Sequence, residues 1–143
     1  MRRHKGFTMI ELIVVLALFS LLFSIALPNS NFVSRTKELQ ELKEFKGDVL
    51  FARNQAIVKG KTHYLKLDYT NNSYFILSEG NEVKRCYFKN GVTLIHNPAV
   101  TEIVFTRSGV PSLGNTIKLK TNDNQRYKLV VNPVTGKITL SEE

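Results

Sequence analysis

Side chains that bind metals or form disulfides are scarce in this chain of 143 residues. Cys86 is its one cysteine, which excludes an intramolecular disulfide and a zinc site built from cysteines. The three histidines, His4, His63 and His96, are scattered along the sequence and make a poor set of metal ligands. We therefore expect no metal and no cofactor.

Catalytic signatures are missing as well. No nucleophile elbow, no pair of catalytic carboxylates and no metal-ligand spacing can be assembled from the sequence. Residues 135–137 read TGK, like the end of a phosphate-binding loop, but such a loop needs a glycine where Val131 stands and a serine or threonine where Ile138 stands. The sequence therefore predicts a β-turn at this place and a protein that is not an enzyme.

Charged side chains are nearly absent from one long stretch near the amino terminus. Between Lys5 and Arg35 the only ionisable side chain is Glu11. Residues 7–27 are 21 mostly apolar positions, which as a helix would span ~32 Å, about the thickness of the hydrocarbon layer of a bilayer. The sequence therefore predicts a membrane-spanning helix in this stretch.

The charges that flank the apolar run predict its orientation. Arg2, Arg3 and Lys5 precede it, with no acidic residue among them. By the positive-inside rule, residues 1–6 lie in the cytoplasm and everything after Leu27 lies outside it. Most of the chain is therefore expected outside the cytoplasm, in a redox environment that the single cysteine leaves open.

Three interpretations of such an amino terminus compete: a secretory signal that is removed, a permanent anchor, and an anchor that is specially processed. A secretory signal normally has only ~7–15 apolar residues, and the run before a small-residue cleavage site at residues 24–26 is longer than that. A plain anchor does not explain Glu11, because a carboxylate inside an apolar helix costs at least ~2.5 kcal/mol. Glu11 therefore needs a partner.

The residues around Glu11 resemble those of a known family. Residues 5–12 read KGFTMIEL, and an apolar run and Pro28 follow them. This segment resembles the class III signal of type IV pilins and type II secretion pseudopilins, in which a prepilin peptidase cuts after the glycine on the cytoplasmic side and methylates the new amino terminus. The resemblance implies cleavage between Gly6 and Phe7, followed by methylation of Phe7.

The same resemblance gives Glu11 and Pro28 definite roles. After cleavage, the amine of Phe7 lies near the start of the helix, and in a filament it would neutralise Glu11 of a neighbouring subunit. The buried charge would then select the axial register of the subunits. Pro28 removes a helical hydrogen bond to the carbonyl of residue 24, which predicts a kink in the helix.

The rest of the chain predicts one amphipathic helix followed by short strands. Apolar residues recur at steps of three and four between Arg35 and Lys59, and Gly60 is a natural cap at the helix end. The apolar positions are Leu39, Leu42, Phe45, Val49, Ala52 and Ala56. Beyond Gly60 the period changes to two, with strands expected at residues 62–69, 74–78, 83–88, 92–95, 102–105, 117–120, 127–131 and 137–140. This pattern predicts an α+β fold in which an antiparallel sheet packs on the amphipathic helix.

Three further segments resemble the GspH/FimT-like minor pilins. Residues 50–57 (LFARNQAI) are similar to a helical segment of this subgroup, and residues 105–109 (FTRSG) and 131–138 are similar to its terminal strands. With the amino-terminal motif, the resemblance covers nearly the whole chain. It implies a pilin-like fold, in which a long hydrophobic helix continues into an amphipathic helix packed on an antiparallel β-sheet head.

The expected organisation has three parts. Residues 1–6 are a leader peptide, residues 7–34 are a transmembrane and filament-core helix, and residues 35–143 are an extracytoplasmic head made of a helix (35–60) and a sheet (61–143). The resemblance implies a minor pilin or pseudopilin, first a single-pass protein of the cytoplasmic membrane and then part of a cell-surface or periplasmic filament. Its implied partners are prepilin peptidase, other major and minor pilins or pseudopilins, and the assembly platform protein of that membrane.

An excess of positive charge is left on the expected head. The net charge of the chain is +8, and it falls to +5 when cleavage removes the three cations of residues 1–6. If residues 117–120 pair with residues 126–129, their outward side chains form two basic rows, which repel each other mildly. These side chains are Lys118, Lys120, Arg126 and Lys128. We predict weak contacts between them and an anionic partner such as DNA, anionic lipid or a teichoic polymer, with a plain solvated face as the alternative.

Two other functions stay open. FimT-like minor pilins include DNA receptors for transformation, which resemble one another in an arginine-rich motif after the terminal glycine. This chain departs from that motif, because Lys137 is the only cation after Gly136 and the tail ends in two glutamates. A DNA receptor and a single-pass membrane-anchored binding protein are therefore the alternatives, and the sequence does not distinguish a type IV pilus from a type II secretion or competence pseudopilus.

Overall fold

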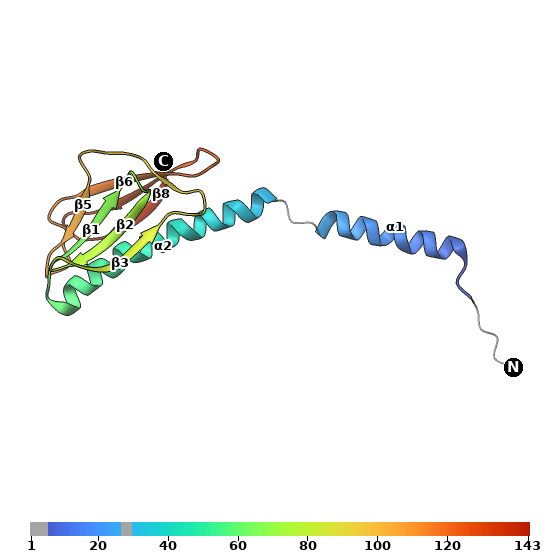
Figure 1. Cartoon of the computed structure of the whole chain (residues 1–143), viewed down its shortest axis with the longest axis horizontal. Helices are drawn as coiled ribbons and strands as arrows, with labels where there is room; N and C mark the ends of the chain where they lie inside the picture. The colour runs from blue at the N-terminus through green and yellow to red at the C-terminus, as the bar shows by residue number, and fades with distance from the viewer. Residues whose placement is uncertain (1–5, 27–29) are drawn as a thin grey trace. The chain divides into compact units, whose positions relative to one another are not determined.

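The computed structural model describes residues 6–26 and 30–143, and the chain divides into two compact units, Met1–Val33 and Ser34–Glu143 (Figure 1). The kink predicted at Pro28 lies outside the described residues.

The first unit contains the helix α1 (Met9–Ala26). Thr8 precedes this helix and caps it, since the backbone N–H of Glu11 donates to Thr8 Oγ1 over 3.3 Å. Over the residues described, neither helix has the length and hydropathy of a membrane span.

The helix α2 (Ser30–Lys59) supplies one wall of the core of the second unit. Five of the apolar positions predicted on its inner face are buried: Leu42, Phe45, Val49, Ala52 and Ala56. Leu39, predicted on the same face, is 36% exposed, so the head's own core begins one turn later than the pattern suggests. The helix ends at the predicted cap, where Gly60 has a φ of 59° and the N–H of Lys61 donates to the carbonyl of Ala56.

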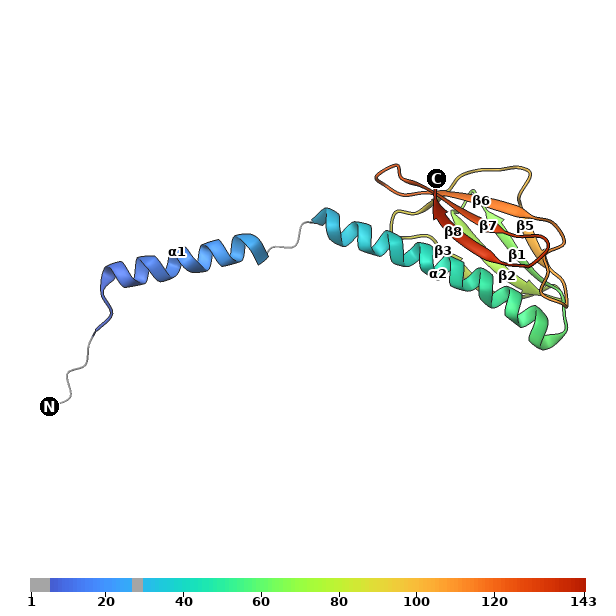
Figure 2. The same ribbon diagram turned by 180° about the vertical axis from the view of Figure 1, so that it is seen from behind.

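The eight strands form two antiparallel sheets of four strands each, whereas the sequence predicts a single sheet (Figure 2). The first sheet has the order β3-β2-β1-β5 and consists of β1 (His63–Asp68), β2 (Ser73–Ser78), β3 (Asn81–Tyr87) and β5 (Glu102–Phe105). The second has the order β4-β6-β7-β8 and consists of β4 (Thr93–Leu94), β6 (Asn115–Lys120), β7 (Arg126–Val131) and β8 (Ile138–Glu142). The α+β fold class is confirmed, and the chain changes sheet three times, from β3 to β4, from β4 to β5 and from β5 to β6.

Both sheets cover the buried face of α2, as Figures 1 and 2 show. Alternate residues of β1, β2 and β5 meet alternate residues of β6 and β7 around Phe45, whose ring lies edge-on to Tyr74 with centroids 4.7 Å apart. Within the described residues, all of the buried apolar residues lie between Leu42 and Val131. The second unit therefore has a complete core of its own.

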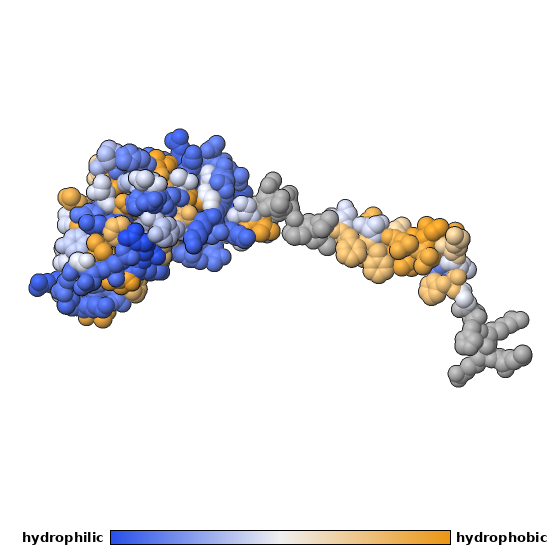
Figure 3. Space-filling view, in the orientation of Figure 1, coloured by the Kyte–Doolittle hydropathy of each residue, from blue (hydrophilic) through white to orange (hydrophobic). Residues whose placement is uncertain are grey.

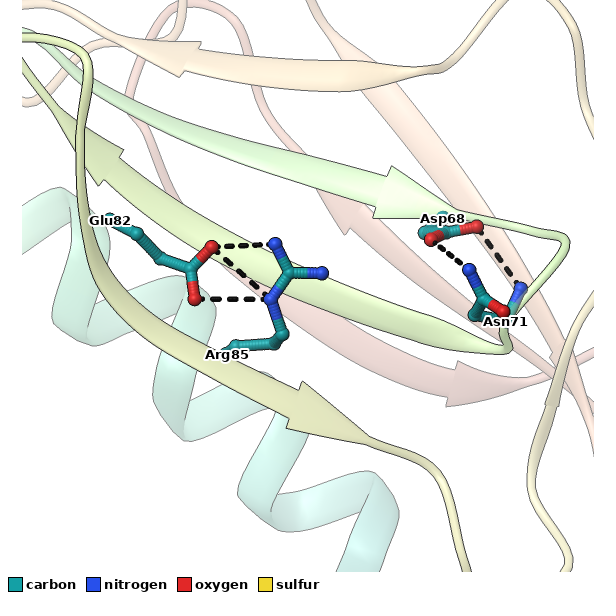
Figure 4. A network of polar contacts seen from close by, with 4 residues as sticks. All are labelled: Asp68, Asn71, Glu82 and Arg85. Atoms are coloured by element: carbon teal, nitrogen blue, oxygen red, sulfur yellow. Dashed lines mark hydrogen bonds and ion pairs between the residues drawn. The ribbon is translucent and has the colours of Figure 1, made fainter.

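The strands β1 and β2 pair as a hairpin. Its turn is fixed by Asp68, whose carboxylate accepts hydrogen bonds from the backbone N–H and the side-chain amide of Asn71 over 3.0 and 2.8 Å (Figure 4). These bonds favour the ionised carboxylate and lower the pKa of Asp68. The strand pairing is thus set by a local capping contact.

Candidate functional site

The segment predicted to be processed lies ahead of α1 and is accessible. Gly6 and Phe7 are exposed and precede the first helical residue, and no atom lies within 4 Å of the position that a Cβ on Gly6 would occupy. A peptidase can reach such a bond without unfolding a helix.

Glu11 lies in the first turn of α1 with its side chain exposed. A carboxylate at this end of a helix is favoured by the helix dipole. The ion pairs of the described residues do not include Glu11. The carboxylate is therefore open to a charge supplied from outside the described residues.

The surface of α1 is apolar on all sides. Every side chain from Phe7 to Ser24 is exposed, and Figure 3 shows hydrophobic residues over most of this helix. A helix that is hydrophobic all round is stable when lipid or other chains cover it. This unit therefore needs a partner environment, while the second unit has its own core.

The two basic rows predicted on the sheet surface are present on β6 and β7. Lys118 lies opposite Lys128 and Lys120 opposite Arg126, while the alternate residues Ile117, Leu119 and Leu129 are buried. The four cations consequently share the outer face of the second sheet.

One of these cations forms an ion pair with the side chain of Glu143. Lys118 Nζ lies 2.6 Å from Glu143 Oε1. The hydrogen bond from Lys118, followed by the charges of Lys118, Lys128 and Arg126, lowers the pKa of Glu143. Lys120, Arg126 and Lys128 have no ion-pair partner within residues 6–26 and 30–143.

Arg53 joins α2 to two loops of the head, a role that the sequence did not predict. Its Nε donates to the carbonyl of Gly109 over 3.0 Å, and its Nη2 donates to the carbonyl of Thr135 over 3.5 Å. Gly136 has a φ of 64°, and a Cβ there would lie 2.7 Å from Arg53 Nε. Arg53 thus joins the three segments that resemble the GspH/FimT-like pilins, and the signal for it was a cation among the apolar residues of 50–57.

Asp48 ties α2 to the first sheet. Its carboxylate accepts hydrogen bonds from Tyr74 Oη over 2.7 Å and from Lys84 Nζ over 2.6 Å, and the Cys86 thiol lies 3.5 Å away. Burial, followed by the Asp48 carboxylate, raises the pKa of Tyr74, and the hydrogen bond to Asp48 raises the pKa of Lys84. The Cys86 side chain is half-buried, and this burial is the main cause that raises its pKa. The thiol is therefore protonated at neutral pH.

In the described part of the chain, no three side chains of His, Cys, Asp or Glu lie close enough to hold a metal ion. The polar contacts of the head join its elements to one another. The candidate functional features are therefore the processed segment with the apolar helix behind it, and the basic sheet face.

Comparisons with known proteins agree with the amino-terminal motif. The model of the prokaryotic N-terminal methylation motif matches residues 1–27. The chain is 28% identical over 112 residues to type II secretion system protein H of Pseudomonas aeruginosa, covering 78% of this chain and 63% of that protein. It is 30% identical over 115 residues to the type IV major pilin protein PilA of Myxococcus xanthus, covering 79% of this chain and 50% of that protein. The chain thus spans between half and two thirds of the length of these relatives.

Solved structures agree with the fold of the head. The type IV minor pilin FimU of Pseudomonas aeruginosa superposes with a TM-score of 0.63 at 17% identity, covering 77% of this chain and 92% of that one. The minor pseudopilin EpsH from the type 2 secretion system of Vibrio cholerae superposes with a TM-score of 0.58 at 15% identity, covering 73% of this chain and 96% of that one.

A methylation motif ahead of an apolar helix, followed by a helix packed on antiparallel sheets, defines a pilin-like protein. The chain carries the prokaryotic N-terminal methylation motif and is similar in sequence to a type II secretion system protein and a type IV pilin, and its head has the fold of the solved minor pilin FimU and minor pseudopilin EpsH.

Proposed function

We propose that the chain is a minor pilin or pseudopilin, a structural subunit that is built into a filament or initiates one. The observation that carries this proposal is the methylation motif at residues 1–27, which runs into a helix whose described side chains are exposed on all sides. Such a helix is covered when it packs among equivalent helices. Because a repeated contact of this kind does not close on itself, it produces an open helical filament.

In this proposal, residues 1–6 are a leader that prepilin peptidase removes, and Phe7 becomes the methylated first residue. Residues 7–34 first anchor the protein in the cytoplasmic membrane and later enter the filament core, with a kink at Pro28. Residues 35–143 are the head outside the cytoplasm. The assembly platform protein of the membrane and the other subunits are the partners, and the filament is a type IV pilus, a type II secretion pseudopilus or a competence pseudopilus.

Glu11 is the assembly residue in this proposal. Its exposed carboxylate stands in the first turn of α1, free of ion pairs within the described residues. The new amine of Phe7 in a neighbouring subunit supplies the positive charge that removes the cost of burying this carboxylate.

Mass spectrometry of the protein from cells with active prepilin peptidase tests the proposal. We expect a mature chain that begins at a methylated Phe7, and an uncut precursor in the membrane when Gly6 is replaced by a bulky residue. A mature chain that begins at Met1 or at Leu27 would refute processing and favour a membrane-anchored or secreted binding protein instead.

The basic face supports a second candidate function, weak binding of an anionic polymer such as DNA. Three cations of this face have no ion-pair partner in the described chain, and they lie on neighbouring strands of a regular sheet. Non-specific electrostatic contact with phosphates requires no more than this. A dedicated DNA receptor is the less favoured form of this proposal, since Glu143 holds Lys118.

A further inference from the structure

A groove of about 350 Å³ lies between the first turns of the head's helix and the edge strand β8, which runs beside α2 in Figure 2. Its floor is apolar and consists of Leu39, Leu42, Tyr127 and Leu140. Leu39 is the one position of the predicted apolar stripe that the head leaves exposed. The apolar face of α2 therefore extends beyond the core and into this groove, called here the β8 groove.

The backbone of β8 offers open hydrogen-bonding groups along the groove. Within the described residues, β8 pairs with β7 alone. The N–H of Glu143 donates to Arg126, and the carbonyl of Lys137 accepts from Asn132, so residues at odd positions face β7. Because a strand alternates, the residues between them turn their N–H and C=O groups outward. These residues are Ile138, Leu140 and Glu142.

An edge of the first sheet, β3, shows what a protected edge looks like in this molecule. β3 carries Glu82, Lys84 and Arg85, of which Glu82 and Arg85 form an ion pair at 2.6 Å (Figure 4), and its register with β2 is interrupted by a bulge. Charges and bulges prevent an edge from pairing with another strand. β8 has a regular register and no charge over residues 138–141, so its edge is open to pairing.

The rim of the β8 groove is positive along α2, whereas Glu142 lines it on the side of β8. Arg35 and Lys43 both line the groove, and neither belongs to an ion pair of the described residues. Their eight-residue separation corresponds to ~12 Å along the helix, which matches about four residues of an extended strand. Two acidic side chains four positions apart on one face of an added strand would reach both cations.

We propose that the β8 groove docks an extended acidic peptide segment, which adds to β8 as a fifth strand and places acidic side chains against Arg35 and Lys43. The backbone of β8 supplies the hydrogen bonds, and the apolar floor receives the side chain between the two acids. This inference does not depend on the proposed filament function, because it concerns only contacts of the head.

A designed pentapeptide is the probe for this proposal. It has glutamates at its first and fifth positions, valine at the third and threonines between them, so that one face carries acid, apolar and acid in turn. Its two controls carry lysines in place of the glutamates, or glutamates moved to the second and fourth positions. Binding of each fluorescent peptide to the full chain in detergent is measured by anisotropy at low salt.

Four variants separate the parts of the groove. The double change Arg35→Glu with Lys43→Glu reverses the rim, and Lys37→Glu is the matched control on an exposed part of α2. Glu142→Pro removes one outward N–H of β8, and Glu142→Ala removes the same side chain but keeps that N–H. Circular dichroism confirms that each variant is folded.

We expect the probe to bind the natural chain, and both controls to bind at least about tenfold more weakly. The rim reversal and Glu142→Pro should each weaken binding about tenfold, whereas Lys37→Glu and Glu142→Ala should leave it within about twofold. Absence of binding, equal binding of the lysine peptide, or equal binding by folded Glu142→Pro and Glu142→Ala would overturn the proposal. Self-association of the chain that Glu142→Pro abolishes would assign the groove to a second copy, and would overturn it as well.

Discussion

Arg53 is the residue through which α2 holds two loops that are distant in the sequence. Its guanidinium reaches the carbonyls of Gly109 and Thr135, which follow β5 and β7. Each sheet contributes one of these loops, so the side chain fastens both sheets to the same helix. Arginine suits this position because its donors are fixed in one plane and it stays charged at all relevant pH values.

Replacing Arg53 by methionine should destabilise the head while keeping most of the side chain's volume. One half-buried and one exposed hydrogen bond to backbone carbonyls are lost, which costs about 1 kcal/mol in the free energy of unfolding and lowers the melting temperature by roughly 4 °C. Thermal unfolding followed by circular dichroism measures this. The matched control is Arg107→Met, since Arg107 is exposed and its change should have little effect. Equal melting temperatures of the two variants would contradict the role of Arg53.

Glu11 acts through another subunit in the proposed filament. Glu11→Gln should therefore leave the Gly6–Phe7 bond cleavable and the chain in the membrane, yet reduce its incorporation into filaments at least about tenfold. The measurement compares the mature protein in sheared filaments with that in membranes. Glu11→Asp is the control because it keeps the charge. Normal incorporation of the glutamine variant would show that the carboxylate is merely tolerated.

At the scale of elements, the outer face of β6 and β7 should bind duplex DNA weakly. Three unpaired cations and Lys118 allow about three to four phosphate contacts, which predicts dissociation constants near ~10⁻⁴–10⁻⁶ M and a slope of about −3 in log K against log salt. Anisotropy of a short labelled duplex measures both. Changing Lys118, Lys120, Arg126 and Lys128 to alanine should abolish the binding, and Lys137→Ala should matter less.

Glu143 allows a further test of DNA binding by this face. Because Glu143 forms an ion pair with Lys118, the change Glu143→Gln should free that cation and tighten DNA binding by about twofold or more. Ser141→Asn, which changes the same strand without changing charge, is its control. Nanomolar, sequence-selective or salt-insensitive binding by the natural chain would instead favour a DNA receptor.

Most elements could be predicted from the sequence because each has one dominant period. Alternation located every strand to within about two residues, and the three-four spacing located α2 with its glycine cap. Most pairing partners could not be predicted, since alternation says which face is buried but not which strand is adjacent. For the same reason a single sheet was expected, although β4 and β5, close in sequence, lie in different sheets.

Contacts between segments that are distant in the sequence could not be predicted either. The two basic rows were predicted from an assumed strand pairing, which the register confirms. The ion pair between Glu143 and Lys118 was not, because it depends on where β8 ends beside β7. Arg53 stood in a recognisable segment, yet its partners are backbone carbonyls, which leave no mark in a sequence. Such contacts depend on the tertiary structure alone.

At the scale of the whole molecule, the unit Ser34–Glu143 should fold without the preceding residues. All the buried apolar residues of the described chain lie inside it, and it contains both sheets and most of α2. We expect residues 34–143 to be soluble and to unfold in a single cooperative thermal transition. A shorter chain that begins at Val49 lacks Leu42 and Phe45 and should not fold. A head that gives no cooperative transition would contradict a self-sufficient core.

The polar contacts of α2 with the rest of the head are spaced along its axis. Glu41 accepts from the backbone of Lys89, Asp48 accepts from Lys84, and Arg53 donates to Gly109. These three positions span ~18 Å of helix, so a pull along the axis loads them in shear and must break them together, whereas a sideways pull would unzip them singly. A subunit that is pulled through its helix should therefore keep its head folded when the force acts along the helix axis.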